Sequence, residues 1–206
     1  EKCRGNVIIE AIVEKQDVKI SLFRQLAERT TADTIFASNT SSLSITELGA
    51  EIPNPERFAG LHFFNPAPLM KLVEVVTGEQ TSEEVIQFLL ELTKAFGKTP
   101  VRCKDAPGFI VNRVARPYYI EALRIAEEGK ITFEEVDQLL ESRGFKLGPF
   151  KLMDLIGNDI NYAVSCSVFD QLQQPERLRP SYLQEEKVAK KELGKKTGKG
   201  YYQYDK

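Results

Sequence analysis

The first half of the chain alternates β-branched apolar runs with amphipathic segments, and this alternation limits the fold more than any other feature. Val7–Ile12 is a compact β-branched run, and Gln16–Glu28 then carries apolar residues at a spacing of four, which is typical of one helical face. Further strands are expected at Thr34–Ser38, Phe58–Phe64, Lys71–Val76 and Pro100–Cys103, and helices at Ile45–Ala50 and Thr81–Phe96. Strands that alternate with helices in this way predict an α/β sheet.

The pattern changes after Lys104–Pro107, because no strand of any length is expected from residue 108 to residue 199. Helices are predicted instead at Phe109–Glu128, with a kink at Pro117, and at Thr132–Ser142, Lys151–Leu172 and Ser181–Leu193. The sequence therefore predicts two domains, an α/β domain at residues 1–105 and an all-α domain at residues 106–206.

Two helix starts carry the pattern of a capping box, in which a hydroxyl side chain is followed three residues later by a glutamate. Thr81 with Glu84 is expected to open the helix that ends near Phe96, and Thr132 with Glu135 the helix that ends near Ser142.

Composition excludes several classes of function. The formal net charge is −2, so nothing indicates a nucleic acid or a membrane surface as partner. No apolar run approaches the roughly 20 residues of a membrane-spanning helix, and no basic-then-apolar leader is present, so a cytoplasmic protein is expected. The three cysteines lack metal-ligand spacing, and no metal site is predicted.

The chain has one histidine, His62, at the end of a predicted strand, and an acid, Glu74, inside the next apolar run. A tight turn at the prolines of NPAPL could bring the two side chains together. A neutral imidazole accepts a proton near pH 7, and a carboxylate on its other nitrogen fixes the tautomer. This pair suits hydroxyl deprotonation coupled to hydride loss, although a His–Glu pair also serves hydrolases. Alternatively, His62 is a hydrogen-bonded core histidine and Glu74 lies on a solvated strand face.

Five blocks of sequence resemble the L-3-hydroxyacyl-CoA dehydrogenase family, and their order and spacing agree over nearly the whole chain. The blocks are FASNTSSL (36–43), FAGLHFFNPAPLMKLVEVV (58–76), KDAPGFIVNR (104–113), GPFKLMDLIG (148–157) and GKKTGKGYYQY (194–204). The resemblance implies oxidation of a (3S)-3-hydroxyacyl-CoA with NAD, or the reverse reaction. It also implies a partial Rossmann-like NAD-binding domain followed by an all-α dimerisation domain, and hence a homodimer.

By this resemblance His62 is the catalytic base and Glu74 orients it. Ser41 would contact the substrate hydroxyl region and the nicotinamide side of the cofactor, and Asn112 would complete the polar ring around the reacting carbon. Ser41 could instead be a structural turn residue, and Asn112 a polar residue near a helix start.

The same resemblance assigns cofactor contacts to Glu14 and Lys19, in the turn after the first strand, and to Lys196 in the tail. Asn65 would support the His62 loop and is also counted among the cofactor-binding residues. Without the resemblance, Glu14 and Lys19 would be a surface pair of less than about 1 kcal/mol, and Lys196 a solvated charge.

One expected motif is missing, because no GxGxxG turn follows the first strand. In family terms the chain starts part-way through the NAD-binding domain, and it has no initiator methionine. The 206-residue chain alone is therefore expected to bind NAD poorly and to turn over substrate negligibly.

Three functions stay open at this stage. The first is dehydrogenation of a short-chain 3-hydroxyacyl-CoA in fatty-acid, butanoate or aromatic-acid breakdown. The second is a related dehydrogenase for a sugar acid such as gulonate, although the sequence segments HFFNP and MKLVEV favour a CoA thioester as substrate. The third is a non-enzymatic dimerisation fragment.

Overall fold

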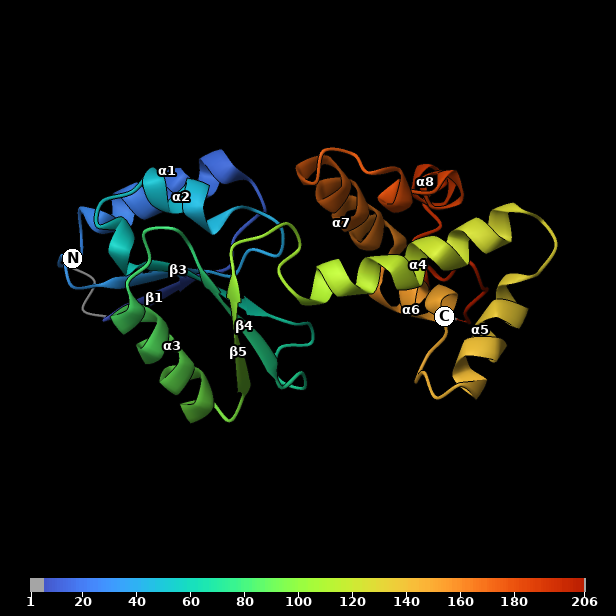
Figure 1. Ribbon diagram of the computed structural model, residues 1–206, viewed down its shortest axis with the longest axis horizontal. Coiled ribbons are helices and arrows are strands. Elements are labelled where there is room, and N and C mark those ends of the chain that lie inside the picture. Colours follow the sequence, from blue (N-terminus) through green and yellow to red (C-terminus); the bar gives the residue numbers. More distant parts are fainter. Residues whose placement is uncertain (1–5, 206) are drawn as a thin grey trace. The chain divides into compact units, whose positions relative to one another are not determined.

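The computed structural model describes residues 6–205, and the chain divides into two units, residues 1–110 and 111–206. The predicted boundary at residue 105 falls in the bend that follows the last strand. The first unit is an α/β domain and the second contains helices and no named strand among its described residues (Figure 1). The predicted fold class, a partial Rossmann-like domain followed by an all-α domain, is confirmed.

The first unit is built on a five-stranded sheet whose spatial order follows the chain, β1-β2-β3-β4-β5. Neighbouring strands are parallel except β3 and β4, which form an antiparallel pair. The strands are β1 (Val7–Glu10), β2 (Ile35–Ser38), β3 (Phe58–Phe63), β4 (Leu72–Thr77) and β5 (Thr99–Lys104).

Helices cover both faces of this sheet, with α1 (Gln16–Ala27) and α2 (Ile45–Ala50) on one face and α3 (Glu83–Ala95) on the other (Figure 1). A short 3₁₀ turn, η1 (Pro55–Arg57), leads into β3. Strand residues alternate between the faces. Phe58 and Val76 belong to the apolar core with α1 and α2, whereas the neighbours Ala59 and Val75 belong to the core with α3.

This alternation places His62 on the same sheet face as Phe58, and Glu74 on the same face as Val76. Both side chains therefore point toward the α1 and α2 side of the sheet. Gly60, between Phe58 and His62, allows α2 to approach closely, because a Cβ there would lie 2.7 Å from Val76 Cβ and 2.9 Å from Ile45 Cδ1.

The second unit contains five α-helices and two 3₁₀ turns in its described part. They are α4 (Val111–Glu127), α5 (Phe133–Ser142), α6 (Pro149–Ile156), α7 (Asn158–Gln171), η2 (Glu176–Leu178), α8 (Tyr182–Ala189) and η3 (Lys195–Thr197). Its main core combines Tyr119, Leu123, Val136, Phe150 and Met153, all buried. No helix in the described part of the chain is both long enough and apolar enough to cross a membrane.

The structure corrects the predicted helix at Lys151–Leu172. Gly157 divides this segment into α6 and α7 and has a φ of 105°, a conformation that residues with a Cβ rarely adopt. Both helices pack against α4, so the apolar pattern continues across the break, and periodicity alone could not show the interruption.

Smaller corrections concern element ends. β1 ends at Glu10 rather than Ile12, and α4 begins at Val111 and runs unbroken through Pro117. The last predicted helix is also shorter, since α8 ends at Ala189.

Candidate active site

His62 and Glu74 face each other directly across the antiparallel strands β3 and β4. His62 Nδ1 lies 2.7 Å from Glu74 Oε2, and the side chains are 7% and 1% exposed. Because a carboxylate only accepts hydrogen bonds, Nδ1 carries the hydrogen, and in a neutral imidazole of this tautomer Nε2 has the free lone pair. The second carboxylate oxygen, Oε1, accepts a hydrogen bond from the Ile110 backbone N–H at 2.9 Å. The pair is a buried imidazole–carboxylate dyad.

Aromatic rings surround the imidazole. The ring of Phe64 lies 4.5 Å from that of His62 between centroids, and the ring of Phe109 lies 5.9 Å away. The two dyad side chains are nearly enclosed, and a charge interaction in such a site is screened less than one at the surface. The dyad is therefore suited to hold an imidazolium ion while a proton is in transit.

The negative charge of Glu74 also acts on a neighbouring thiol. Burial, together with the charges of Glu74 and Asp105, raises the pKa of the Cys103 thiol to about 12. Cys103 consequently stays protonated at neutral pH and is not a candidate nucleophile.

The loops after β1 and β2 meet through Glu14. Its Oε1 accepts hydrogen bonds from the Thr40 hydroxyl at 2.5 Å and from the backbone N–H groups of Ser41 at 2.9 Å and Ser42 at 3.2 Å. Burial alone would raise the pKa of Glu14, but these hydrogen bonds and the charge of Lys19 hold the pKa below its usual value. Glu14, Ser41 and Lys19, singled out from the sequence, therefore lie together.

Lys19 is not the surface residue that its charge suggests, because its side chain is 1% exposed. Its ammonium lies 2.7 Å from Glu10 Oε1 and 3.3 Å from Glu14 Oε2. Glu10, in turn, accepts a hydrogen bond from the Ser38 hydroxyl at 2.7 Å. The sequence analysis did not single out Glu10. The signal that could have found it is an acidic residue inside an otherwise apolar strand.

These groups share one edge of the sheet. β1, β2 and β3 are parallel, so the segments after them, which carry Glu14, Ser41 and Asn65, all leave at the carboxyl edge. His62 lies on β3 at the same edge, and the Asn39 side chain accepts a hydrogen bond from the Phe63 N–H at 2.8 Å. Open α/β sheets bind their ligands beyond the carboxyl ends of the strands.

Asn65 is exposed in the β3–β4 loop. Asn112 and Lys196 belong to the second unit, where Asn112 lies in the first turn of α4. Lys196 forms an ion pair with Asp159, with 2.6 Å between Nζ and Oδ1. The roles of these three residues stay predictions.

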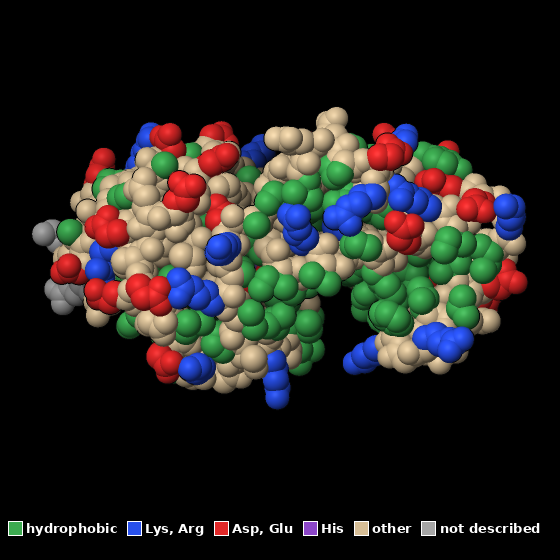
Figure 2. All heavy atoms as spheres, viewed as in Figure 1, with side chains coloured by type: hydrophobic (Ala, Val, Ile, Leu, Met, Phe, Trp, Pro, Cys, Tyr) green, Lys and Arg blue, Asp and Glu red, His purple; other side chains and the backbone are tan. Residues whose placement is uncertain are grey.

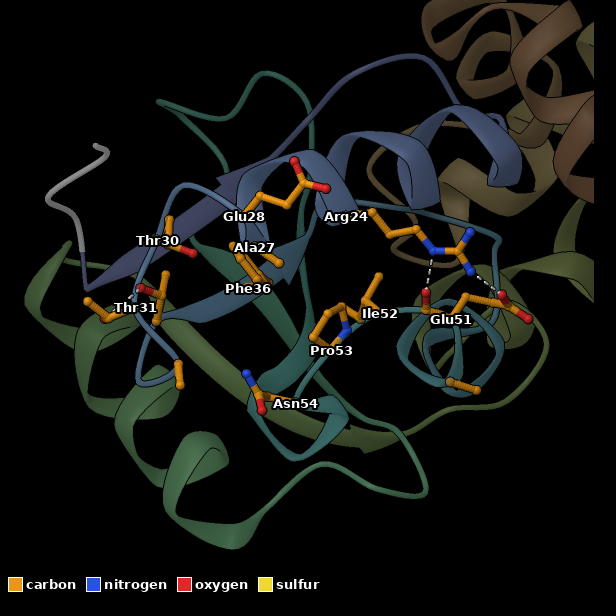
Figure 3. Close-up of a pocket in the computed structure, with 13 residues that line it drawn as sticks. Arg24, Ala27, Glu28, Thr30, Thr31, Phe36, Glu51, Ile52, Pro53 and Asn54 are labelled. Atoms are coloured by element: carbon orange, nitrogen blue, oxygen red, sulfur yellow. Dashed lines mark hydrogen bonds and ion pairs between the residues drawn. The ribbon is translucent and has the colours of Figure 1, made fainter. Parts of the chain in front are cut away.

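The first unit also has a cavity of about 600 Å³ elsewhere. It lies between the end of α1, the α1–β2 loop and the segment after α2 (Figure 3), with the Arg24–Glu51 ion pair beside it. Thr34, one of its lining residues, precedes β2, so the cavity lies at the amino edge of the sheet, opposite His62. Among the described residues no group of three or more His, Cys, Asp or Glu side chains could hold a metal ion.

Comparison with known proteins identifies the family. The family model for the 3-hydroxyacyl-CoA dehydrogenase NAD binding domain matches residues 1–106, and the model for the C-terminal domain of the same enzymes matches residues 108–204. The chain belongs to the 3-hydroxyacyl-CoA dehydrogenase family.

Individual members of this family are similar over almost the whole chain. The 3-hydroxyadipyl-CoA dehydrogenase of Escherichia coli is 55% identical over 97% of the chain, which covers 42% of that protein. The mitochondrial hydroxyacyl-coenzyme A dehydrogenase of Sus scrofa is 46% identical over 97% of the chain, which covers 64% of that enzyme. The chain thus spans less than two thirds of the length of these curated relatives.

Solved structures of 3-hydroxyacyl-CoA dehydrogenases agree. A 3-hydroxybutyryl-CoA dehydrogenase from Escherichia coli superposes with a TM-score of 0.95 at 54% identity, covering 98% of this chain and 43% of that one. The (S)-3-hydroxybutyryl-CoA dehydrogenase from Ralstonia eutropha gives a TM-score of 0.93 at 40% identity, covering 98% of this chain and 71% of that one.

Proposed function

We propose that the protein oxidises (3S)-3-hydroxyacyl-CoA thioesters to 3-oxoacyl-CoA with NAD, and catalyses the reverse reaction. The observation that carries this proposal is the buried dyad, in which His62 Nδ1 and Glu74 Oε2 are 2.7 Å apart. The relatives named above support the substrate class, because their names specify 3-hydroxyadipyl-CoA and 3-hydroxybutyryl-CoA.

In the proposed reaction His62 accepts the proton of the substrate hydroxyl at Nε2 as its O–H bond breaks. Glu74 keeps its hydrogen bond to Nδ1–H and stabilises the imidazolium that forms. NAD, when bound, would accept the hydride that leaves the carbon bearing this hydroxyl. In the reverse direction the imidazolium returns its proton to the developing alkoxide.

The carboxyl edge of the first unit has side chains that would contact one part of the cofactor but not all of it. The Glu14 carboxylate is 36% exposed, and with the Ser41 hydroxyl it would provide polar contacts to the nicotinamide and ribose end. Lys19 would act by holding Glu14 in place, because its ammonium is already enclosed by Glu10 and Glu14. No glycine-rich turn that could hold a pyrophosphate occurs in the sequence. We therefore expect weak binding of NAD by the 206-residue chain alone.

Further parts of the proposal concern the second unit. Asn112 would contact the substrate, and Lys196 would exchange its ion pair with Asp159 for a contact to the cofactor. Apolar side chains gather on the face of the molecule shown in Figure 2. Val114, Leu139 and Ile160 are exposed apolar residues of the all-α unit, and they would be covered in a homodimer. A cytoplasmic location and a role in fatty-acid or related acid breakdown also stay predictions.

The test uses the full-length protein. Reduction of NAD is followed by absorbance with 3-hydroxybutyryl-CoA and with 3-hydroxyadipyl-CoA, and gulonate serves as the sugar-acid alternative. His62→Gln and Glu74→Gln are each expected to lower kcat by about 10²–10⁴-fold, because proton transfer loses its acceptor or that acceptor loses its orientation.

The matched control is Glu79→Gln, which neutralises an exposed carboxylate just after β4 and should leave kcat unchanged. Full activity of His62→Gln, or oxidation of gulonate in preference to both thioesters, would overturn the proposed function.

A further inference from the structure

Lys98 lies between α3 and β5, where a helix-ending motif fixes its backbone. Gly97 has a φ of 72°, its N–H donates to Lys94 O at 2.9 Å, and the Lys98 N–H donates to Thr93 O at 3.2 Å. This pair of bonds is the Schellman arrangement that closes a helix with a left-handed glycine. The next residue, Thr99, begins β5 and donates its N–H to Lys71 O at 2.8 Å. Lys98 is thus held against the connection between β3 and β4.

The ammonium of Lys98 binds backbone carbonyls of this connection. Its Nζ lies 2.5 Å from Ala67 O, 2.9 Å from Met70 O and 3.4 Å from Pro68 O. An ammonium has three N–H donors, and this loop offers one carbonyl to each. Lys98 forms no ion pair with any carboxylate in the described part of the chain.

The loop that Lys98 binds joins the two halves of the dyad, since it runs from Phe64, just after His62 and Phe63, to Lys71, just before β4. Phe64 packs against the His62 ring at its start, but the distal part of the loop has little apolar packing, because Leu69 is 76% exposed and Met70 42% exposed. Its internal backbone bonds run from Leu69 and Met70 to Pro66 O. Charge-assisted hydrogen bonds are stronger than neutral ones, so the ammonium is a strong tie between this loop and the start of β5.

We propose that Lys98 is a positioning residue for the His62–Glu74 dyad: by binding the carbonyls of Ala67, Pro68 and Met70, it fixes the β3–β4 connection and thereby the approach of His62 to Glu74. Lys98 does not touch the reacting groups. The role in catalysis rests on the proposed function, whereas the geometric effect on His62 does not.

The geometric effect can be measured directly, because His62 is the only histidine of the chain. Imidazole NMR of the 206-residue chain therefore reports one residue, including the proton that Nδ1 donates to Glu74. In Lys98→Met, which keeps the aliphatic stem and removes all donors, we expect this proton signal to move upfield and broaden. Lys98→Arg keeps the charge but not three converging donors, so its signal should fall between those of Lys98→Met and the unchanged chain.

The matched control is Lys94→Met on α3. It removes an exposed lysine whose ammonium forms an ion pair with Glu91 at 2.7 Å, and it should leave the His62 signal unchanged. Should Lys98→Met fail to fold, Lys98→Gln gives the same comparison, because its shorter amide cannot reach all three carbonyls. An unchanged His62 signal in the folded Lys98 variant, or an equal change in Lys94→Met, would overturn the proposal.

Activity of the full-length protein then separates the two proposals. Lys98→Met should lower kcat roughly ten- to a hundredfold with KM changed less than about twofold, as expected for a misplaced base. A changed His62 signal together with full activity of His62→Gln would remove the proposed function and leave the positioning effect intact. An unchanged His62 signal in the Lys98 variant together with an inactive His62→Gln would remove the positioning effect and leave the proposed function intact.

Discussion

At the residue scale, charges that look like surface groups in the sequence form a network at the carboxyl edge of the sheet, in which Lys19 and Glu10 are buried and Glu14 is partly exposed. Lys19 bridges Glu10 and Glu14, and Glu14 accepts hydrogen bonds from the backbone N–H groups of Ser41 and Ser42. A charge removed from water this far requires such partners, because an unpaired one would be costly. The network explains why the loops after β1 and β2 keep a defined position beside the dyad.

The lowered pKa of Glu14 predicts a pH dependence of stability. A carboxyl whose folded pKa lies below its usual value stabilises the fold fully above that usual value and loses the effect as the pH falls through the folded pKa. Glu14→Gln should therefore destabilise the chain at pH 7, by about 0.5–1 kcal/mol after allowance for solvent screening.

Urea unfolding at pH 7 and at pH 3.5 measures this effect, and the difference from the unchanged chain should shrink at the lower pH. Glu56→Gln, at an exposed carboxylate, is the control and should show no such trend. A Glu14→Gln difference that is constant or grows on acidification would contradict the prediction.

At the element scale, one predicted capping box is confirmed and the other is wrong. Thr132 and Glu135 form the reciprocal hydrogen bonds of a capping box at the start of α5. At α3 the cap is Ser82 rather than Thr81, because the Thr81 hydroxyl donates to Phe58 O at 2.7 Å instead. The sequence offered two adjacent hydroxyl residues, and a contact to a distant strand decided between them.

The cap of α5 gives a test of local stability. Thr132→Ala removes the acceptor for the Glu135 N–H and should reduce the free energy of unfolding by about 1 kcal/mol. Thr132→Ser keeps that acceptor and should cost little. Chemical denaturation monitored by circular dichroism measures both, and equal losses in the two variants would show that the hydroxyl is not what stabilises the helix start.

At the scale of the whole molecule, each unit has its own core, and the second is closed by its C-terminal tail. Asp154 on α6 is 1% exposed and accepts hydrogen bonds from the backbone N–H groups of Tyr201 and Tyr202 and from the Tyr204 hydroxyl, each at 3.0 Å. The tail passes so close that a Cβ on Gly200 would lie 2.0 Å from Asp154 Oδ1. The tail is therefore an integral part of the all-α unit.

Loss of this anchor should loosen the second unit alone. Asp154→Asn replaces one acceptor oxygen with an N–H₂ group that faces N–H and O–H donors, at a cost of about 2 kcal/mol. Hydrogen exchange followed by mass spectrometry should show faster exchange in α6, α8 and the tail, and unchanged exchange in β2, β3 and β4. Equal acceleration in the sheet would contradict the independence of the two cores.

The sequence by itself determined the α/β-then-all-α organisation, and together with the family resemblance it predicted the pairing of His62 with Glu74. Local periodicity marks strands and helices, and a proline-containing connection allows two successive strands to pair, so both inferences depend on neighbours along the chain. The resemblance to the family pointed to Ser41, Glu14 and Lys19, because it can be read from short stretches of local sequence.

The tertiary structure decided what depends on distant partners. The break at Gly157, the choice of Ser82 over Thr81, the burial of Lys19 against Glu10 and the binding of Lys98 to the β3–β4 loop all join residues that are separate in the sequence or share an uninterrupted apolar pattern. A side chain's hydrogen-bond partner is set by which strands and helices pack together, and only the folded chain contains that information.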